Sequence, residues 1–447
     1  MGAPVRYSPS TTRSEQPTAS TRPGNESMDP LHERILRRNA WRLLPLLTVA
    51  YVINYLDRTN VSFAALTMNK DLGLTATQYG RGAGIFFLAY CLFELPSNLA
   101  LYRFGARLWI ARIMVTWGLL SVAMAFIGGV WSFYIMRFLL GAAEAGFFPG
   151  IAYYLAAWFP AQYRSRILAG FLVGIPFSTV IGAPLSGLIL ELDGLWGLAG
   201  WKWLFMLEGI PAVILGVVVA RVLADRPETA SWLSPEEKTA LTTLLAAEPR
   251  ERVRTGAWAT IKDARVLICA AIQFGFTLGS YGVLFWLPQI IKASGVSNLT
   301  VSVLTAIPYL FATAAMIWWA LLVDKSGKKI VNLAIACGLG AAGLVVSVLS
   351  GSLAVGLTGL TIALIGITSA RGIFWSIPAR FMTGVGAAAG LAFINSIGVL
   401  GGYFGPELMG TLKDTTGGYF AGLLAMAAIL GMSTLLSASL KLFIKME

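Results

Sequence analysis

The chain of 447 residues carries little charge for its length and contains almost no histidine or cysteine. Asp, Glu, Lys and Arg make up 13% of the residues, whereas soluble globular proteins average about a quarter. Cys91, Cys269 and Cys337 lie far apart in apolar segments, so they predict neither a disulfide framework nor a metal site. The single histidine, His32, precedes the first apolar segment, which excludes a proton pathway built from histidines.

What the sequence has in excess is apolar residues, at 56%. They occur in blocks of about 20 residues, the length that crosses a hydrocarbon core. The blocks are uniformly apolar and do not alternate, which favours helices over barrel strands. The sequence therefore predicts an all-α membrane protein of twelve transmembrane helices. The expected spans are 41–62, 79–102, 108–128, 131–158, 166–190, 201–223, 265–291, 299–322, 329–350, 353–376, 381–410 and 418–443.

Lys and Arg gather before the first span, after the even-numbered spans and in the tail. Cytoplasmic loops carry this excess, so both termini are expected to be cytoplasmic. The net charge of +12 is explained by these loops, and we expect no nucleic-acid partner. The residues that carry the bias are Arg34, Arg37, Arg38, Arg42, Arg103, Arg107, Arg164, Arg166, Lys325, Lys328, Lys329, Arg380, Lys441 and Lys445.

Composition divides the chain into four parts. Residues 1–40 are rich in Ser, Thr and Pro toward their start and predict a disordered cytoplasmic tail. Residues 41–223 hold the first six spans, 224–262 form a polar cytoplasmic connector, and 263–447 hold the last six. Within the connector, Ser234 followed by Pro and two Glu predicts the start of a helix.

The two halves are similar to each other. "RFGAR" contains Gly105 and "KSGKK" contains Gly327, and 327 − 105 is 222. The fifth and eleventh spans contain Pro184 and Pro406, and 406 − 184 is again 222. The shared offset predicts two pseudo-repeated six-helix bundles, as in transporters built from parallel repeats.

The offset also shows which charges helix packing does not require. Asp57, Arg137 and Glu144 lie within spans of the first half. The corresponding positions in the second half are at or near Gly279, Gly359 and Gly366. A charge at mid-membrane costs about 2.5–3.5 kcal/mol on insertion scales, so these charges need a compensating role.

Two charge pairs stand in the first half: Asp57 with Arg58 in "YLDRTN", and Arg137 with Glu144 in "RFLLGAAEAGFFPG". The second pair is about two helical turns apart on one face, with Gly141 between. One interpretation is a pair of buried salt bridges that fix helix register. The other is a site in which the arginines bind an anion and the carboxylates exchange protons.

Other polar or aromatic residues within the spans are candidates for lining such a site: Tyr55, Tyr90, Trp375, Asn395 and Ser396. Asn395 fits a helix–helix hydrogen bond and a ligand contact equally well. Arg371 is a candidate second cation, although snorkelling to the membrane interface is the favoured interpretation. Glu208 also lies within a span and has no evident role from the sequence.

The motifs "YLDRTN", "ELPSNLALYRFGARLWIAR", "RFLLGAAEAGFFPG" and "INSIGVLGGYFGP" resemble the anion:cation symporter family of the major facilitator superfamily, and most closely its bacterial tartrate- and phthalate-type permeases. The resemblance covers about residues 40–443. It implies two bundles that rock about a central site, and uptake of an organic anion with protons across the inner membrane. It implies no enzyme activity, cofactor or metal, and we expect a monomer.

On that resemblance, Arg58 and Arg137 would bind carboxylate, Asp57 and Glu144 would carry protons, and Arg371 favours a dicarboxylate. The expected cytoplasmic gate comprises Glu94, Arg103, Gly105, Arg107, Asp324 and Gly327. The second copy of the family's gate loop departs from the usual pattern, since Ala320 and Lys325 replace glycine and arginine in "ALLVDKSG".

Three alternatives remain open at this stage. The first is a carrier with sodium coupling, exchange or uniport in place of proton symport. The second is a membrane sensor that binds an acid without moving it, for which the connector is short as an output domain. The third is an enzyme, but the sequence offers no metal cluster, nucleophile–base pair or phosphate loop.

Overall fold

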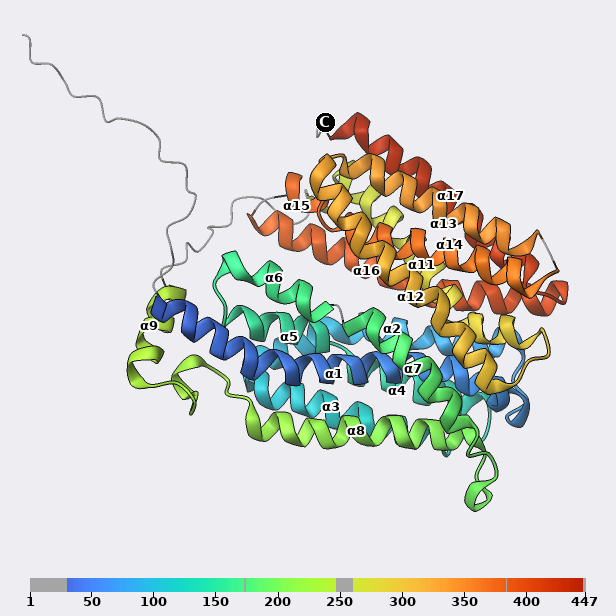
Figure 1. The fold of residues 1–447 in the computed structure, drawn as a ribbon, viewed down its shortest axis with the longest axis horizontal. Coiled ribbons are helices and arrows are strands. Elements are labelled where there is room, and N and C mark those ends of the chain that lie inside the picture. Colours follow the sequence, from blue (N-terminus) through green and yellow to red (C-terminus); the bar gives the residue numbers. More distant parts are fainter. Residues whose placement is uncertain (1–29, 173, 247–259, 350, 383, 445–447) are drawn as a thin grey trace, which may run out of the picture.

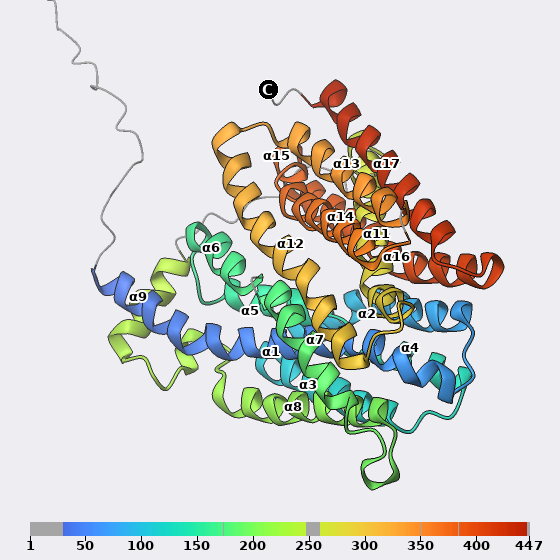
Figure 2. The same ribbon diagram turned by 45° about the vertical axis from the view of Figure 1, so that its right-hand side comes forward.

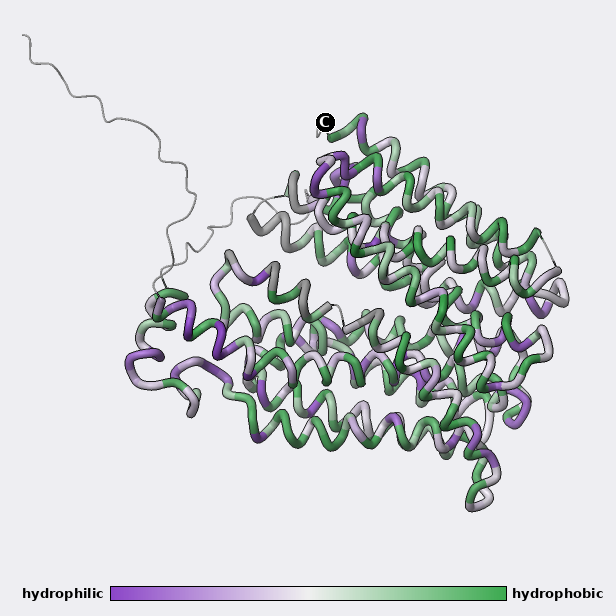
Figure 3. Tube along the Cα trace, viewed as in Figure 1, coloured by the Kyte–Doolittle hydropathy of each residue, from purple (hydrophilic) through white to green (hydrophobic). Residues whose placement is uncertain are grey.

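The computed structural model describes residues 30–172, 174–246, 260–349, 351–382 and 384–444, and its regular elements are helices throughout these ranges. Most of the predicted tail lies outside them. Two bundles of helices lie side by side (Figure 1). The helices are predominantly hydrophobic, and hydrophilic stretches gather near their ends and in the connector (Figure 3).

The N-terminal bundle contains the predicted spans one to six. Its helices are α1 Pro30–Asp71, α2 Ala76–Phe104, α3 Ala106–Met124, α4 Val130–Glu144, α5 Phe147–Ala156, α6 Ala161–Leu172, α7 Gly174–Leu190 and α8 Gly200–Val222. The predicted fourth span is thus two helices, α4 and α5. The predicted fifth span likewise falls on α6 and α7.

The C-terminal bundle contains the other six spans. Its helices are α11 Ala264–Lys292, α12 Asn298–Ser326, α13 Lys329–Val348, α14 Leu353–Phe374, α15 Pro378–Phe381, α16 Gly384–Thr416 and α17 Phe420–Phe443. The duplication is visible in the helix boundaries, because 298 − 76 and 326 − 104 both give 222 for the ends of α12 and α2. In the described part of the chain, nine helices are long and apolar enough to cross a membrane.

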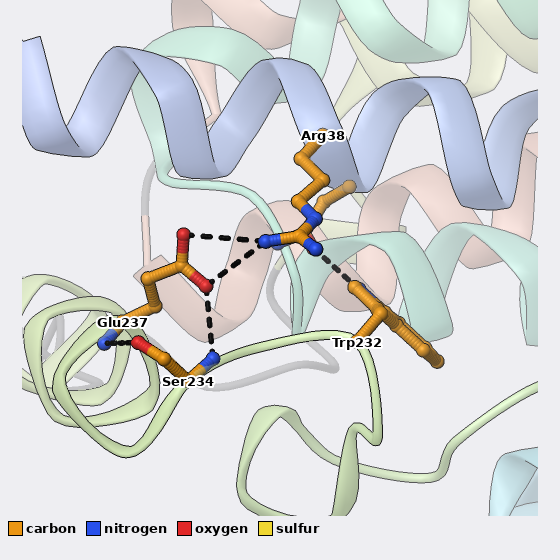
Figure 4. Close-up of polar contacts among 5 residues, drawn as sticks. Arg38, Trp232, Ser234 and Glu237 are labelled. Atoms are coloured by element: carbon orange, nitrogen blue, oxygen red, sulfur yellow. Dashed lines mark hydrogen bonds and ion pairs between the residues drawn. The ribbon is translucent and has the colours of Figure 1, made fainter.

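The start of α1 corrects one prediction. Residues 30–40 were expected in a disordered tail, but α1 begins at Pro30. Their polar side chains dock on the connector, where the guanidinium of Arg38 pairs with Glu237 at 3.3 Å (Figure 4). The Trp232 indole donates a hydrogen bond to the Asn39 side-chain oxygen at 3.0 Å. These contacts hold the first three turns of α1 against the connector.

The connector forms the helix that its sequence predicts. Helix α9 spans Pro235–Ala246. The Glu237 amide donates to the Ser234 hydroxyl at 3.2 Å, and the Ser234 amide donates to the Glu237 carboxylate at 2.9 Å (Figure 4). This reciprocal pair is a capping box. Short 3₁₀ turns at Leu195–Gly197 and Pro227–Thr229 complete the described elements.

The bundles meet along three helix pairs: α2 with α16, α7 with α12, and α1 with α11 (Figure 2). The polar contacts lie at the end where α2 begins and α16 ends, which we call the closed end. There the Arg81 guanidinium pairs with Glu407 at 2.8 Å. The Asp414 carboxylate accepts hydrogen bonds from the backbone amides of Ala76 at 3.1 Å and Thr77 at 2.7 Å. A side chain of one bundle therefore caps a helix of the other.

Glycine permits the close approach of α2 and α16 at the closed end. A Cβ atom on Gly80 would overlap the carbonyl oxygen of Pro406, and one on Gly410 would overlap that of Ala76. Next to Gly80, the Tyr79 hydroxyl of α2 donates a hydrogen bond to the Phe285 carbonyl of α11 at 3.0 Å. At the opposite end, near α9, the ribbons of the two bundles diverge (Figure 1).

We therefore predict that Gly80→Val separates the bundles at the closed end. A cysteine placed at Phe285, in a protein whose three native cysteines are changed to alanine, should then react faster with a membrane-impermeant maleimide. Gly431→Val is the matched control, because a Cβ atom there meets no other heavy atom within 4 Å. Equal labelling rates in the two valine variants would contradict the prediction.

Candidate functional site

The charged side chains of the first and fourth spans come together inside the N-terminal bundle. Asp57 and Arg58 lie on α1, and Arg137 and Glu144 lie on α4. Asp57, Arg137 and Glu144 are fully buried. The Arg58 side chain is 13% exposed, so it is the member of the group that reaches solvent.

The ion pair in this group joins the two helices, unlike the charge pairs within each span that the sequence analysis identified. The Arg58 guanidinium donates to Glu144 Oε2 at 2.8 Å. The same oxygen accepts a hydrogen bond from the Asn54 amide at 2.9 Å. Three aromatic rings surround the guanidinium at 5.2–5.8 Å from their centroids: Tyr55, Phe86 and Tyr90. The rings keep the guanidinium in place through cation–π contacts.

Asp57 faces a different neighbour from Arg58, because successive residues of a helix point about 100° apart. Its Oδ1 accepts hydrogen bonds from Asn60 at 3.1 Å and from the Ser121 hydroxyl of α3. Its Oδ2 is buried and has no hydrogen-bond partner among the described residues. Asp57 therefore belongs to the interior of the bundle, next to the Arg58–Glu144 pair.

Arg137 is a buried guanidinium with few partners. Its Nη2 donates to the Ala83 carbonyl at 3.3 Å, and its plane lies 4.8 Å from the Phe86 ring centroid. Within the described residues, Nε and Nη1 have no acceptor, and Oε1 of Glu144 has no donor. Buried donors are normally paired, so the unmatched N–H groups of the buried Arg137 leave it with unused hydrogen-bonding capacity toward an added acceptor.

A break in the fourth span positions Glu144. Glu144 is the last residue of α4, and Gly146 then adopts the left-handed conformation with φ +84 before α5 begins. A non-glycine residue there would be strained and would also meet the Ser97 hydroxyl. Gly141, expected to leave room between the charges, instead lets α2 approach: a Cβ atom would overlap the Phe86 carbonyl.

Arg371 points inward, which contradicts the snorkelling interpretation. Its Nη2 donates to the Ser280 hydroxyl of α11 at 3.0 Å, and its guanidinium lies 5.9 Å from the Tyr281 ring centroid. It also interacts with the Tyr55 hydroxyl of α1. Tyr55 therefore contacts a cation from each bundle, Arg58 on one side and Arg371 on the other.

The other predicted lining residues are less closely tied to the arginines. Trp375 is 38% exposed at the end of α14, and its ring packs on Phe374. The Ser396 carbonyl accepts a long hydrogen bond, 4.0 Å, from the Cys91 thiol of α2. Asn395 is half-buried on α16. None of the contacts described for these residues reaches Arg58 or Arg137.

The expected gate residues fall at the end of the bundles opposite the closed end. Gly105, with φ +88, joins α2 to α3, and a Cβ atom there would meet the Asp225 carboxylate at 2.9 Å. Asp225 accepts a hydrogen bond from the Arg107 amide at 2.9 Å and pairs with its guanidinium at 3.4 Å. In the second half, Asp324 is exposed and Gly327, with φ +70, ends α12.

Two other residues of the expected gate have different surroundings. The Arg103 guanidinium lies 5.5 Å from the ring centroid of its neighbour Phe104. Glu94 is close enough to Tyr90 and Arg58 to interact with both electrostatically. Glu94 therefore lies nearer to the charged group than the position of its motif in the sequence implied.

The sequence reasoning missed several partners of the charged residues: Asn54, Asn60, Ser121, Asp225, Ser280 and Tyr281. Asn54 and Asn60 could have been found, because each is one helical turn from a charged residue in an apolar run. Ser121 and Ser280 gave no comparable signal, since single serines are common in membrane helices.

Comparison with known proteins decides the family. A model of the Major Facilitator Superfamily matches residues 47–406. The chain belongs to this superfamily. The resemblance noted from its motifs is thereby confirmed at the level of the superfamily, as is the all-α fold of two repeated bundles.

Several relatives are similar over nearly the whole chain. A protein of Agrobacterium vitis named "Putative tartrate transporter" is 48% identical over 91% of both chains. The "Quinolone resistance transporter" of Acinetobacter baumannii is 41% identical over 89% of this chain and 92% of its own. The "Inner membrane transport protein RhmT" of Escherichia coli strain K12 is 36% identical over 92% and 96%. This protein is thus a multi-pass transporter of small organic compounds.

Among solved structures, a bacterial homologue of the human lysosomal transporter Spinster, in an inward-facing and unoccupied conformation, has a TM-score of 0.73. It shares 16% of residues and covers 93% of this chain and 97% of its own. At this identity the likeness shows the shared fold.

The buried ion pair predicts a characteristic pattern of stability. Glu144→Leu alone should lower the free energy of unfolding by about 3 kcal/mol, because it leaves the Arg58 guanidinium unpaired. Adding Arg58→Leu should recover most of that loss, since both charges are then removed. Thermal unfolding in detergent, followed by the intrinsic tryptophan fluorescence of the whole chain, measures the difference. At the half-exposed pair at the closed end, Glu407→Leu should cost less than about 1 kcal/mol. Additive losses in the double variant would contradict the prediction.

Proposed function

We propose that this protein is a secondary active transporter that imports an organic dicarboxylate, such as tartrate or phthalate, together with protons. One observation carries the proposal: a fully buried arginine, Arg137, has two nitrogens without acceptors beside the Arg58–Glu144 pair. A guanidinium presents forked donors that match a carboxylate. Arg137 with Arg58 therefore forms the substrate-binding centre.

The proposed coupling follows from competition for Arg58. In the structure, the Glu144 carboxylate neutralises Arg58 at 2.8 Å. A substrate carboxylate that takes this place on Arg58 leaves Glu144 in an apolar interior without its cation, where the ionised form is costly. Glu144 then takes up a proton from solvent. Asp57, whose described contacts do not include an ion pair with Arg58, is the second proton carrier.

The proposed substrate class is a dianion because a second cation faces the same tyrosine from the other bundle. Arg58 and Arg371 both contact Tyr55, and they belong to α1 and α14. A dicarboxylate that binds one arginine with each end would draw the two bundles together. A monocarboxylate has no second charged end with which to bind the other arginine. Tyr90, Trp375, Asn395 and Ser396 would complete the lining once the bundles move.

The names of the relatives support an organic compound as the substrate but do not identify which compound it is. The Agrobacterium relative is named for tartrate, and the Acinetobacter relative is named for quinolone resistance. We take the inner membrane as the location, with both termini cytoplasmic and a monomer as the unit. The Gly105–Arg107–Asp225 contact, with Arg103, Asp324 and Gly327, would form the cytoplasmic gate.

The experiment that tests this function measures internal pH in proteoliposomes loaded with a pH-sensitive dye. Tartrate, phthalate, galactonate, 4-hydroxyphenylacetate and a quinolone are added outside in turn. Proton symport predicts acidification with a dicarboxylate, and its loss in Asp57→Asn and Arg137→Lys. Glu236→Gln, an exposed substitution on α9, is the control and should behave as wild type.

Each alternative gives a different result in the same vesicles. If labelled tartrate enters only with a sodium gradient and the interior does not acidify, the coupling ion is sodium and not a proton. Entry only against preloaded tartrate would indicate exchange, and entry down its own gradient alone would indicate uniport. Binding without entry of any compound would indicate a sensor. Any of these outcomes would overturn proton symport.

Arg371 should set the preference for dianions. Arg371→Gln is expected to lower tartrate uptake about tenfold or more, because a charge-assisted contact of about 1.5–3 kcal/mol is lost. Uptake of galactonate, which has one carboxylate, should change little. Competition between labelled tartrate and galactonate in one assay gives the ratio. Equal loss for both acids would mean that Arg371 serves the structure alone.

A further inference from the structure

A second polar group lies inside the N-terminal bundle, and the proposed transport cycle gives it no role. Glu208 of α8 is 5% exposed. Its Oε1 accepts a hydrogen bond from the Ser186 hydroxyl of α7 at 2.8 Å. Its Oε2 is buried and has no partner in the described part of the chain. A carboxyl group at this depth is costly unless its second oxygen is also satisfied.

Glu208 and Asp57 belong to one cluster. Ser121 of α3 donates to Asp57 and packs against Gly209, the residue after Glu208, where a Cβ atom would lie 3.0 Å from the Ser121 Cβ. Asn60 donates to Asp57 at 3.1 Å and also interacts with Glu208. The two carboxyl groups are close enough to interact electrostatically.

The cluster has too few hydrogen-bond donors. Asp57 Oδ2, Asn60 Oδ1 and Glu208 Oε2 are all buried acceptors without a donor among the described residues. Each such atom costs about 1–3 kcal/mol. A proton on Glu208 Oε2 would convert one acceptor into a donor and could satisfy Asn60 Oδ1 or Asp57 Oδ2 as well. One added proton thus relieves two unmatched atoms.

The charged groups around Glu208 also favour a protonated carboxyl group at this position. The groups that face it are Asp57 and Asn60 from α1, Ser186 from α7 and Ser121 from α3, so the one charged neighbour described is another carboxylate. Among the described residues of the bundle interior, the carboxylates of Asp57, Glu144 and Glu208 face the guanidiniums of Arg58 and Arg137, and Glu94 also interacts with Arg58. With all of these groups ionised, negative charges would outnumber positive ones, which a low dielectric strongly disfavours.

We propose that Glu208 and Asp57 form a carboxyl pair that holds one exchangeable proton. The proton resides on Glu208 Oε2 while Asp57 is ionised. When it transfers to Asp57 Oδ2, Glu208 becomes the carboxylate and keeps its hydrogen bond from Ser186. The pair therefore keeps a single negative charge wherever the proton sits. The inference rests on the proposed role of Asp57 in proton coupling and adds Glu208 as a second proton-binding residue.

Infrared difference spectroscopy of the full-length protein in lipid, recorded without substrate during stepwise changes of pH, tests the pair directly. Wild type should show a carbonyl band of a protonated carboxylic acid that disappears at alkaline pH. Glu208→Gln should lose this band, and Glu208→Asp should retain it at a shifted frequency. Glu236→Gln, on the exposed face of α9, should leave it unchanged.

Three outcomes would overturn the proposal. The carbonyl band could be unchanged in Glu208→Gln, or it could fail to respond to pH in wild type. The third outcome is loss of the band on adding sodium at constant pH, which would identify a sodium site. If Glu208→Gln does not fold, Ser186→Ala replaces it, since loss of the hydrogen bond to Oε1 must shift the band. An unshifted band would then refute the assignment. No substrate is used, so failure of tartrate to acidify vesicles would not affect the result.

Discussion

The charges in the N-terminal bundle must balance, and most of the site follows from this constraint. An apolar helical bundle offers little water to solvate Asp57, Arg58, Arg137 or Glu144, so each has to be matched by a partner or a proton. The match is incomplete: Glu144 satisfies Arg58, whereas Arg137 retains donors without acceptors. In the proposed function, this incomplete matching distinguishes a binding site from a structural salt bridge. A substrate anion or a proton would then change the stability of the arrangement.

The second half of the chain shows how the equivalent helices pack when glycine stands in place of the buried charged residues. Gly359 and Gly366 correspond by the repeat to Arg137 and Glu144. Cβ atoms on these glycines would overlap backbone atoms of α13, at Ser347 and Gly340. Close backbone packing thus occupies the place that charged side chains take in the first half. The two repeated bundles therefore differ: the first holds the buried charged group, whereas the second contributes Arg371, which donates to Ser280.

The sequence predicted the architecture because the signals for it can be read directly from the order of the residues. These signals are the long apolar blocks, the 222-residue offset and the capping signal at Ser234, and the structure has helices where they predict them. The sequence singled out the buried charged residues but did not predict their contacts. Arg58 was paired with its neighbour Asp57, yet a helix points adjacent side chains apart, and only the packing of α1 on α4 brings Arg58 to Glu144. The start of α1 at Pro30 was missed because polar residues there are stabilised by the connector, a tertiary effect that composition does not reveal.

The closed end and the charged group are mechanically linked through the same helices. Helix α1 carries Asp57 and Arg58 and contacts α11, which carries Ser280, the partner of Arg371. Helix α2 supplies Phe86 and Tyr90 to the Arg58 surroundings and, at its first turn, is capped by Asp414 of α16. A ligand that moves Arg58 and Arg371 toward each other would therefore act on two of the three helix pairs that join the bundles. Helix α2 contacts α16 through close glycine contacts, the Asp414 cap and the Arg81–Glu407 ion pair. In the proposed function, opening that end breaks these polar contacts, and charge-assisted hydrogen bonds between the substrate and the arginines at the centre would offset their loss.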